Sequence, residues 1–242
     1  MEITILYLYY DLMNLYGESG NIRVLEHHLH DQGLEVTVDK KSIGDDIDFA
    51  QYAFIYMGSG TERNQKIALA DLFRYQEQIK SSVQNGTVFL FTGNAFEMLG
   101  KSITAGNGIV HEGIGLSDFT TVEHSDIRYT GDVICNFDKL ETPMVGFINK
   151  CSEIIGIPQT LFQVAMGPGN AINDKQEGWR YQNVFGTHLI GPVLVKNPHF
   201  MNYIIKLIGS NLQGFEYKPL PYPYEESAYQ VTLSALQKRL EK

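Results

Sequence analysis

The stretch F-L-F-T-G-N-A-F-E-M-L-G, from Phe89 to Gly100, decides the fold of this chain. A turn at Asn85-Gly86 leads into the apolar run Thr87 to Phe91, and Thr92-Gly93-Asn94-Ala95 then turns the chain again. A continuous apolar run is typical of a strand buried on both faces, as in the centre of a parallel sheet. The sequence therefore predicts a central parallel strand that ends in a tight, glycine-containing turn.

The segments on the N-terminal side of this stretch follow the same pattern. The runs Ile3 to Tyr10 and Tyr52 to Met57 are continuous and apolar, whereas Leu34 to Val38 alternates and predicts a strand nearer the sheet edge. Helical spacing of apolar residues lies between these runs, first from Ile22 to Leu29 and again from Glu62 to Gln84. Strands that alternate with helices predict an α/β fold with an open, mostly parallel sheet and right-handed crossovers.

The chain changes character after Gly100. Short β-like segments separated by glycines predict a mixed or antiparallel half that packs on the parallel half. These segments are Ile109-Val110, Phe119 to Val122, Asp132 to Cys135, Met144 to Ile148, Gln163 to Met166 and Asn183 to Leu189. A helical pattern from Phe200 to Ile208 follows and ends at Gly209.

The C-terminal part is expected to be an appendage of a single domain. We place the domain at residues 1–214 and a Pro/Tyr-rich segment with a C-terminal helix at residues 215–242. Three of the eight prolines lie between Pro219 and Pro223, which predicts an extended segment before a helix from about residue 225 to 242. One face of this helix carries an apolar stripe, which either packs on its own domain or docks to another protein. The stripe is Tyr229, Leu233, Leu236 and Leu240.

Length and composition exclude several classes of function. Nineteen basic against 28 acidic residues give a net charge of −9, the wrong sign for a chain that neutralises nucleic-acid phosphates. The longest apolar run is far shorter than the roughly 20 residues of a membrane span, and the sequence predicts neither a span nor a signal peptide. Cys135 and Cys151 are too few for a disulfide framework, which favours a reduced, cytoplasmic setting.

Chemistry in open α/β sheets lies beyond the carboxyl ends of the strands, here after Met57 and after Phe91. The first of these segments is the glycine-rich Gly58-Ser59-Gly60. The second has the form of a nucleophile elbow, a sharp strand-to-helix turn that lifts one side chain above the sheet beside a helix N-terminus. Its tip is Gly93, and a glycine turn after a strand is by itself an ordinary structural feature.

A series of further motifs surrounds the elbow in order, from about Met1 to Gly214. They are D-L-M-N-L-Y-G-E-S-G-N-I (Asp11 to Ile22), M-G-S-G-T-E-R-N-Q (Met57 to Gln65), Y-T-G-D-V-I (Tyr129 to Ile134), V-G-F-I-N (Val145 to Asn149) and F-G-T-H-L-I-G-P-V-L-V-K-N-P (Phe185 to Pro198). With these motifs the chain resembles class I glutamine amidotransferase-like proteins of the cobyric acid synthase type. More closely, it looks like the glutaminase subunits of lipid II isoglutaminyl synthases, which serve peptidoglycan amidation in cell wall biogenesis. The resemblance implies a three-layer, flavodoxin-like, mostly parallel sheet with helices on both faces.

The resemblance also implies a catalytic dyad, of which both members are replaced. In the family a cysteine at the elbow tip attacks the glutamine amide, and a histidine on a distant strand accepts the thiol proton. Matching the motifs puts Gly93 at the nucleophile position and Ile190 at the base position. The surrounding frame remains: Gly58, Ser59, Gly60 and Asn94 at the expected oxyanion or ligand-binding positions, and Arg128 where the family has an arginine implicated in glutamine handling.

Other residues offer weak substitutes for this dyad. Cys135 and Cys151 lie outside any strand-to-helix turn, and Ser59 between two glycines is typical of turn hydrogen bonding. Thr92 is expected to point to the opposite face of its strand from the tip. His188 is the more interesting candidate, because residues 188 and 190 of one strand would share a face about 6.6 Å apart.

These observations leave three hypotheses open. The leading one is a glutaminase-inactive pseudoenzyme that acts as a binding or regulatory partner of a Mur-ligase-like, ATP-dependent enzyme. The resemblance implies this partner, because members of that family work in a pair with such an enzyme. The second is an active amidase or amidotransferase with a remodelled site. The third is a sensor of a small anionic or glutamine-like ligand, bound at the free N–H groups of the turn.

One cluster of the first helix has the residue types of a metal site. Glu26 and His30 are four residues apart, beside His27, His28 and Asp31. Without a third ligand from another element, the cluster is typical of a solvated helix face. We therefore expect no metal and no cofactor.

Overall fold

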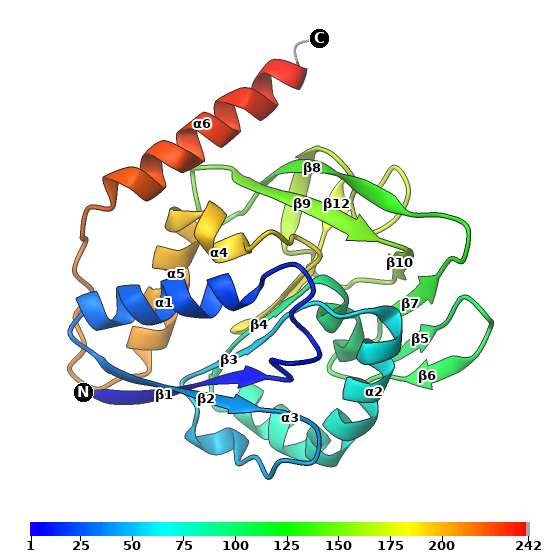
Figure 1. Cartoon of the computed structure of the whole chain (residues 1–242), viewed down its shortest axis with the longest axis horizontal. Coiled ribbons are helices and arrows are strands. Elements are labelled where there is room, and N and C mark those ends of the chain that lie inside the picture. The colour runs from blue at the N-terminus through cyan, green and yellow to red at the C-terminus, as the bar shows by residue number, and fades with distance from the viewer. Residues whose placement is uncertain (241–242) are drawn as a thin grey trace.

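The computed structural model describes residues 1–240 and has a six-stranded sheet at its centre (Figure 1). The strand order is β13-β14-β4-β3-β1-β2. Neighbouring strands are parallel except for the antiparallel pair of β13 and β14. The strands are β1 (Glu2–Leu8), β2 (Glu35–Lys41), β3 (Phe54–Met57), β4 (Val88–Thr92), β13 (Trp179–Tyr181) and β14 (Val184–Thr187).

Burial of the strands follows the apolar patterns of the sequence. Every residue of β3 and β4 is buried, and both strands lie inside the sheet. β2 alternates between exposed and partly buried residues and lies at the edge. The predicted central and edge strands are therefore confirmed.

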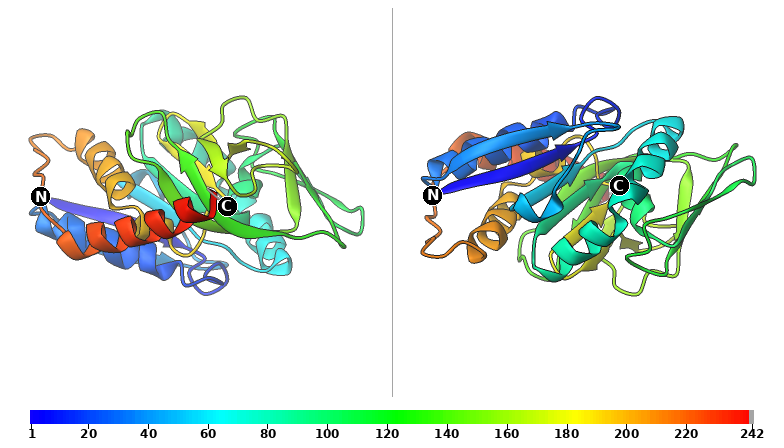
Figure 2. Two further views of the ribbon diagram at one scale, coloured as in Figure 1. Left: turned by 90° about the horizontal axis from the view of Figure 1, so that it is seen from above. Right: turned by 90° about the horizontal axis from the view of Figure 1, so that it is seen from below.

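Helices cover both faces of the sheet, which gives the three layers of the expected fold (Figures 1 and 2). Ile5 and Phe54 pack in one core with helices α1 (Ser19–Asp31), α4 (Val193–Lys196) and α5 (Pro198–Ser210). Leu6 and Ile55, one position further along, pack in a second core with α2 (Glu62–Leu72) and α3 (Gln76–Gln84). The sequence predicted one long helix from residue 62 to 84, whereas a 3-10 turn, η2 (Phe73–Tyr75), divides it. A further short turn, η1 (Phe49–Gln51), precedes β3.

The segment after Gly100 forms two four-stranded sheets, as the mixed or antiparallel prediction required. One has the order β10-β7-β5-β6 and contains a single parallel pair, β5 with β7. The other, β12-β11-β8-β9, is antiparallel. The strands are β5 (Ser102–Thr104), β6 (Val110–Glu112), β7 (Thr120–Glu123), β8 (Tyr129–Asn136), β9 (Met144–Lys150), β10 (Ser152–Ile155), β11 (Phe162–Met166) and β12 (Gln176–Glu177). The predicted segment Asn183 to Leu189 instead returns to the central sheet as β14.

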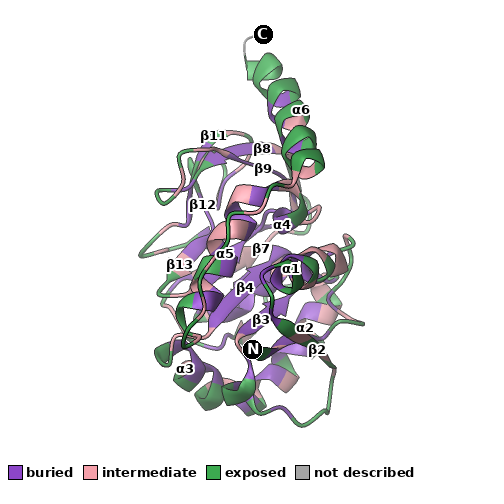
Figure 3. Cartoon of the chain, turned by 90° about the vertical axis from the view of Figure 1, so that its left-hand side faces the viewer, coloured by how far each residue is buried: buried purple, intermediate pink, exposed green. Residues whose placement is uncertain are grey.

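The C-terminal helix α6 (Pro223–Leu240) packs on the domain through three residues of the predicted stripe. Tyr229, Leu233 and Leu236 are buried against Ile134 and Val145, whereas Leu240 is half exposed (Figure 3). The last two residues of the predicted helix, 241 and 242, lie outside the described part of the chain. None of the helices within residues 1–240 has the length and apolar composition needed to cross a bilayer.

Candidate functional site

The turn after β4 is a sharp one with Gly93 at its tip. β4 ends at Thr92, and the 3-10 segment η3 (Gly93–Leu99) begins directly after it. Gly93 has a φ of +59°, in the left-handed region that favours glycine. A Cβ atom built on Gly93 would lie 2.3 Å from Ser59 Oγ and 2.5 Å from Ser59 Cβ. The Ser59 side chain therefore fills the space that any side chain at the tip would need.

A cavity of about 170 Å³ lies beside this turn, at the carboxyl ends of the central strands. Seven residues singled out from the sequence line it: Ser59, Gly60, Gly93, Asn94, Arg128, Cys151 and His188. Gly58 lies outside the lining, and a Cβ there would meet Met13 O at 2.5 Å, so its role is close backbone packing. Ile190 is also outside the lining, but its Cγ2 lies 3.4 Å from a Cβ built on Gly93. The elbow tip and the matched base position are therefore neighbours in space.

Asn94 occupies the hydrogen-bonding groups of the glycine loop. Its Oδ1 accepts from the backbone N–H of Gly60 at 2.9 Å and from Ser59 Oγ at 3.2 Å. Its Nδ2 donates to the carbonyl oxygen of Gly60 at 2.9 Å. A side-chain carboxamide thus pairs with both backbone groups of Gly60, at the loop where the resemblance places the oxyanion donors.

A second side chain, that of Glu18, binds the backbone N–H of Ser59 in this loop. The carboxylate is fully buried, and it accepts from the backbone N–H of Ser59 at 2.8 Å and of Tyr16 at 3.1 Å. Burial raises the pKa of Glu18 to about 7, and the backbone N–H donors oppose this rise. The N–H groups of both Ser59 and Gly60 are consequently bonded to the protein's own side chains.

His188 belongs to a buried polar cluster at the floor of the cavity. Its Nε2 lies 3.1 Å from Glu97 Oε1, and its backbone N–H donates to Glu177 Oε1 at 2.7 Å. Ser152 Oγ and Gln65 Nε2 also donate to the Glu97 carboxylate. Burial alone would raise the pKa of Glu97, but the bonds from His188, Ser152 and Gln65 hold it below its usual value.

The structure corrects the expected relation between residues 188 and 190. β14 ends at Thr187, so the alternation of a strand does not extend to these residues. His188 turns to Glu97, whereas Ile190 joins an isolated bridge with Phe147 and turns towards Gly93. His188 therefore contacts Glu97, whereas the elbow tip at Gly93 has Ile190 beside it.

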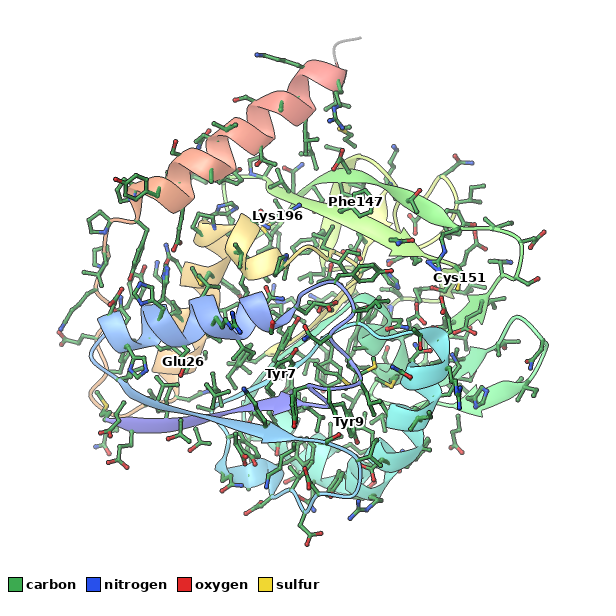
Figure 4. All side chains as sticks on the ribbon, in the orientation of Figure 1. Tyr7, Tyr9, Glu26, Phe147, Cys151 and Lys196 are labelled. Carbon is green, nitrogen blue, oxygen red and sulfur yellow. The ribbon has the colours of Figure 1, made fainter. Side chains whose placement is uncertain are left out.

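Arg128 closes one side of the cavity with three neighbours. It donates to Asn149 Oδ1 at 2.9 Å and to Glu62 Oε1 at 3.1 Å, and Asn149 Nδ2 donates to Tyr16 OH at 3.0 Å. Cys151, just after β9, lines the same wall and its thiol donates to Glu62 Oε1 at 3.3 Å (Figure 4). Burial and the Glu62 carboxylate raise the pKa of Cys151 to about 12, so the thiol is neutral and unreactive at physiological pH.

The other candidate substitutes point away from the cavity. Cys135 lies in the core, where burial raises its thiol pKa. Thr92 Oγ1 lies 2.9 Å from Tyr56 OH, and Thr92 is not among the residues that line the cavity. Lys150 was missed from the sequence: it lines the cavity, donates to Asn170 O at 2.7 Å, and has its pKa lowered to about 8 by burial. Glu97, Ser152 and Tyr16 also line the cavity. Neither these residues nor Lys150 were singled out from the sequence as site residues, because only the fold brings them to the cavity.

Each histidine of the cluster on α1 contacts a different partner, so the side chains do not converge on one point. His28 Nε2 lies 2.9 Å from Glu225 Oε1, and its ring stacks on Tyr222 with centroids 3.7 Å apart. His27 lies beside Asp31, His30 Nδ1 lies 3.1 Å from Leu34 O, and Glu26 is half-buried on α1 (Figure 4). Within residues 1–240, no three His, Cys, Asp or Glu side chains come close enough to hold a metal ion.

Comparison with known proteins gives concordant results for family and fold. A family model described as a CobB/CobQ-like glutamine amidotransferase domain matches residues 4–198. The chain is 30% identical over 236 residues to the lipid II isoglutaminyl synthase (glutamine-hydrolyzing) subunit GatD of Staphylococcus aureus, covering 98% of this chain and 94% of that protein. It is 33% identical over 198 residues to the GatD subunit of Streptococcus pneumoniae, covering 81% and 76%.

Two solved structures share the fold at low sequence identity. A crystal structure of a glutamine amidotransferase superposes with a TM-score of 0.56 at 13% identity, covering 84% of this chain and 98% of that one. The structure of PurLQS from Thermotoga maritima gives 0.54 at 15% identity, covering 88% and 98%. These likenesses support the fold, and the expected α/β class is confirmed.

Proposed function

The chain belongs to the CobB/CobQ-like glutamine amidotransferase family, and from this premise we propose that it is a glutaminase-inactive member. In this proposal it acts as a binding or regulatory subunit of a Mur-ligase-like, ATP-dependent enzyme of lipid II amidation. The chain would shape or stabilise that partner without supplying ammonia from glutamine.

The elbow carries the proposal. Thiol-dependent amide hydrolysis needs a nucleophile at the tip and a base beside it. Gly93 offers no side chain, Ser59 fills the space of one, and the adjacent Ile190 cannot accept a proton. Replacing one residue would not rebuild the pair, because nucleophile and base act as a unit.

The hydrogen bonds around the cavity support the same proposal. An oxyanion hole works by N–H groups that are free to meet a developing negative charge. Here the N–H groups of Ser59 and Gly60 are bonded to Glu18 and Asn94. A substrate oxyanion would have to displace a buried carboxylate and a carboxamide, which weighs against transition-state stabilisation at this loop.

The subunit role is supported by the relatives. Both GatD proteins are named as subunits, and the alignment with one of them covers almost the whole of both chains. Similarity over almost the whole chain, with both positions of the dyad replaced, supports a role in assembly in preference to one in catalysis. Assembly with a Mur-ligase-like protein is therefore the function that we assign to it.

A remodelled amidase is the alternative that one observation favours. Ser152 lines the cavity and its hydroxyl donates to Glu97, which His188 contacts on the same oxygen. A carboxylate whose pKa is held below its usual value is a poor base for a serine hydroxyl. The contact therefore weighs less than the loss of the elbow side chain.

The proposal is tested by co-expressing the chain with a Mur-ligase-like protein of its own organism and purifying the complex. We expect a stable complex that amidates the lipid II stem with ammonium salts and fails to do so with glutamine. Amidation from glutamine by the complex contradicts the inactive site, and absence of a complex contradicts the partner. Ser152→Ala is the matched control: it leaves the ammonium-dependent rate unchanged in either case, and it abolishes glutamine-dependent amidation only if the remodelled amidase is correct.

A further inference from the structure

Helix α6 is held to the domain by few residues (Figure 1). It buries three of its 18 residues, whereas the neighbouring α5 buries seven of its 13. The three are Tyr229, Leu233 and Leu236, which pack on strands β8 and β9. The ion pair of Arg239 with Asp132 near the end of the helix is largely exposed, and such pairs contribute little. Because segments with few buried apolar contacts open more readily than the core, a change in one contact of α6 weakens its docking noticeably.

One of these contacts is made by His199, the second residue of α5. Its ring packs edge-on against the ring of Tyr229, with the centroids 4.8 Å apart. Tyr229 OH donates to Pro143 O at 2.6 Å, which holds the tyrosine beside the histidine. Both ring nitrogens of His199 are buried, and neither has a hydrogen-bond partner within residues 1–240. The neutral ring tolerates such a site, whereas the imidazolium would bury an unpaired charge with two N–H donors.

The location of His199 also favours its neutral form. The ring lies in the first turn of α5, where the positive end of the helix dipole repels a cation. Glu226 of α6 is the carboxylate that acts on the ring, and Lys196 of α4 turns its Nζ to Gly191 instead. Burial lowers the pKa of His199 from its usual 6.5, and Glu226 and the Pro143 carbonyl oppose this only in part. His199 is therefore neutral while α6 covers it.

The second histidine of this junction responds to a proton in the opposite way. His28 Nε2 on α1 lies 2.9 Å from Glu225 Oε1 in the first turn of α6. The His28 ring stacks on Tyr222, just before the helix, and Tyr222 OH donates to Asp31 of α1. A proton on His28 makes the contact with Glu225 a charge-assisted bond. Acid therefore strengthens the attachment of the first turn and weakens the contact of the next turn with His199.

We propose that α6 is a pH-sensitive latch: a proton on His199 releases the helix from Tyr229 onward, while Glu225 keeps its first turn attached to α1. The proton comes from the solvent, and the imidazolium is hydrated once the tyrosine ring has moved away. Release uncovers the apolar face of β8 and β9 that Leu233 and Leu236 cover in the docked state. The inference is independent of the proposed function, because none of these residues lines the cavity at the elbow.

The size of the effect follows from the linkage of one proton to the release. The released helix leaves His199 with the usual pKa of histidine, about 6.5, whereas the docked helix resists the proton. Docking is therefore strongest above pH 6.5 and weakens as the pH falls below this value. Between pH 7.5 and 5.5 the equilibrium constant for release rises by up to about tenfold, the limit set by one proton with this pKa.

The test is hydrogen exchange of the full chain at pH 7.5 and pH 5.5. Each rate is divided by the intrinsic rate of the same amide at the same pH, which gives a protection factor. We expect the protection factors of residues 229–240 to fall by about three- to tenfold at pH 5.5, while those of α5 stay constant. An equal fall in α6 and α5 indicates a loss of global stability and overturns the proposal.

Variants assign the effect to its group. His199→Phe keeps an aromatic ring against Tyr229, His199→Gln keeps a polar side chain, and neither takes a proton, so in both the protection of α6 is the same at the two pH values. His111→Gln removes a histidine of β6, in the other four-stranded sheet, and leaves the fall as in wild type. Binding of a hydrophobic dye at pH 5.5 rises in wild type and not in His199→Phe, because only wild type uncovers β8 and β9. A wild type without the fall, or a His199 variant that retains it, contradicts the latch.

Discussion

Substitution of Gly93 by alanine tests whether the elbow is closed to any side chain. The structure places a Cβ at this residue in the left-handed region and 2.3 Å from Ser59 Oγ. The matched control is Gly115→Ala, because Gly115 has a similar φ of +68° and nothing within 4 Å of its Cβ position. The difference between the two variants isolates the contact with Ser59 from the backbone strain.

The magnitudes follow from two separate costs. A non-glycine residue in the left-handed region costs about 1 to 2 kcal/mol, which is the whole expected effect of Gly115→Ala. Overpacking against Ser59 adds about 1 to 3 kcal/mol for Gly93→Ala. At about 2 to 4 °C per kcal/mol for a chain of this size, the contact lowers the melting temperature by roughly 2 to 12 °C beyond the control.

The assay is thermal unfolding of five proteins: wild type, Gly115→Ala, Ser59→Gly, Gly93→Ala and the double variant Ser59→Gly, Gly93→Ala. In the double variant the contact is gone, so Gly93→Ala should cost no more in the Ser59→Gly background than Gly115→Ala costs in wild type. A Gly93→Ala protein that is as stable as Gly115→Ala would refute the reasoning, since Ser59 would then leave room for a side chain.

Three further predictions concern the same site. The triple variant Ser59→Gly, Gly93→Cys, Ile190→His recovers a trace of glutamine hydrolysis and is labelled at position 93 by a glutamine-mimicking electrophile, whereas the variant without the Ile190 change releases no glutamate. The pKa of Glu18 is raised from 4.5 to about 7, so the folded state holds a proton that the unfolded state releases. The free energy of unfolding therefore falls by about 3 kcal/mol as pH rises from about 4.5 to about 7, and a melting series of Glu18→Gln shows no such fall. Asn94→Ala leaves the Gly60 N–H and carbonyl unpaired and lowers the unfolding free energy by about 1 to 3 kcal/mol, measured by denaturant titration, without restoring hydrolysis.

Local patterns were sufficient to predict the central sheet. The apolar runs that became β1, β3 and β4 have no polar face, and only the middle of a sheet buries both sides of a strand. The strands that escaped prediction are short or polar, such as Ser152–Ile155 and the two residues of β12. Their strand geometry comes from pairing with neighbours distant in sequence, which a local pattern does not encode.

The candidate site was predictable in position and less so in contacts. The turn chemistry and the motifs located Gly93, and the structure brings Ile190 beside it. The bond of His188 to Glu97 joins residues 91 positions apart. β14 ends at Thr187, and the next backbone N–H, that of His188, donates to the Glu177 carboxylate instead of to a strand. Such pairings depend on tertiary packing, so the occupied oxyanion loop and the turned histidine could be found only in the structure.

Glutamate release from L-glutamine by the purified chain tests the central claim most directly. The inactive elbow predicts release at the rate of buffer alone, with Ser152→Ala and Cys151→Ala indistinguishable from wild type. Release that depends on the chain, and that either variant abolishes, would contradict the account and identify the nucleophile of an active, remodelled amidase.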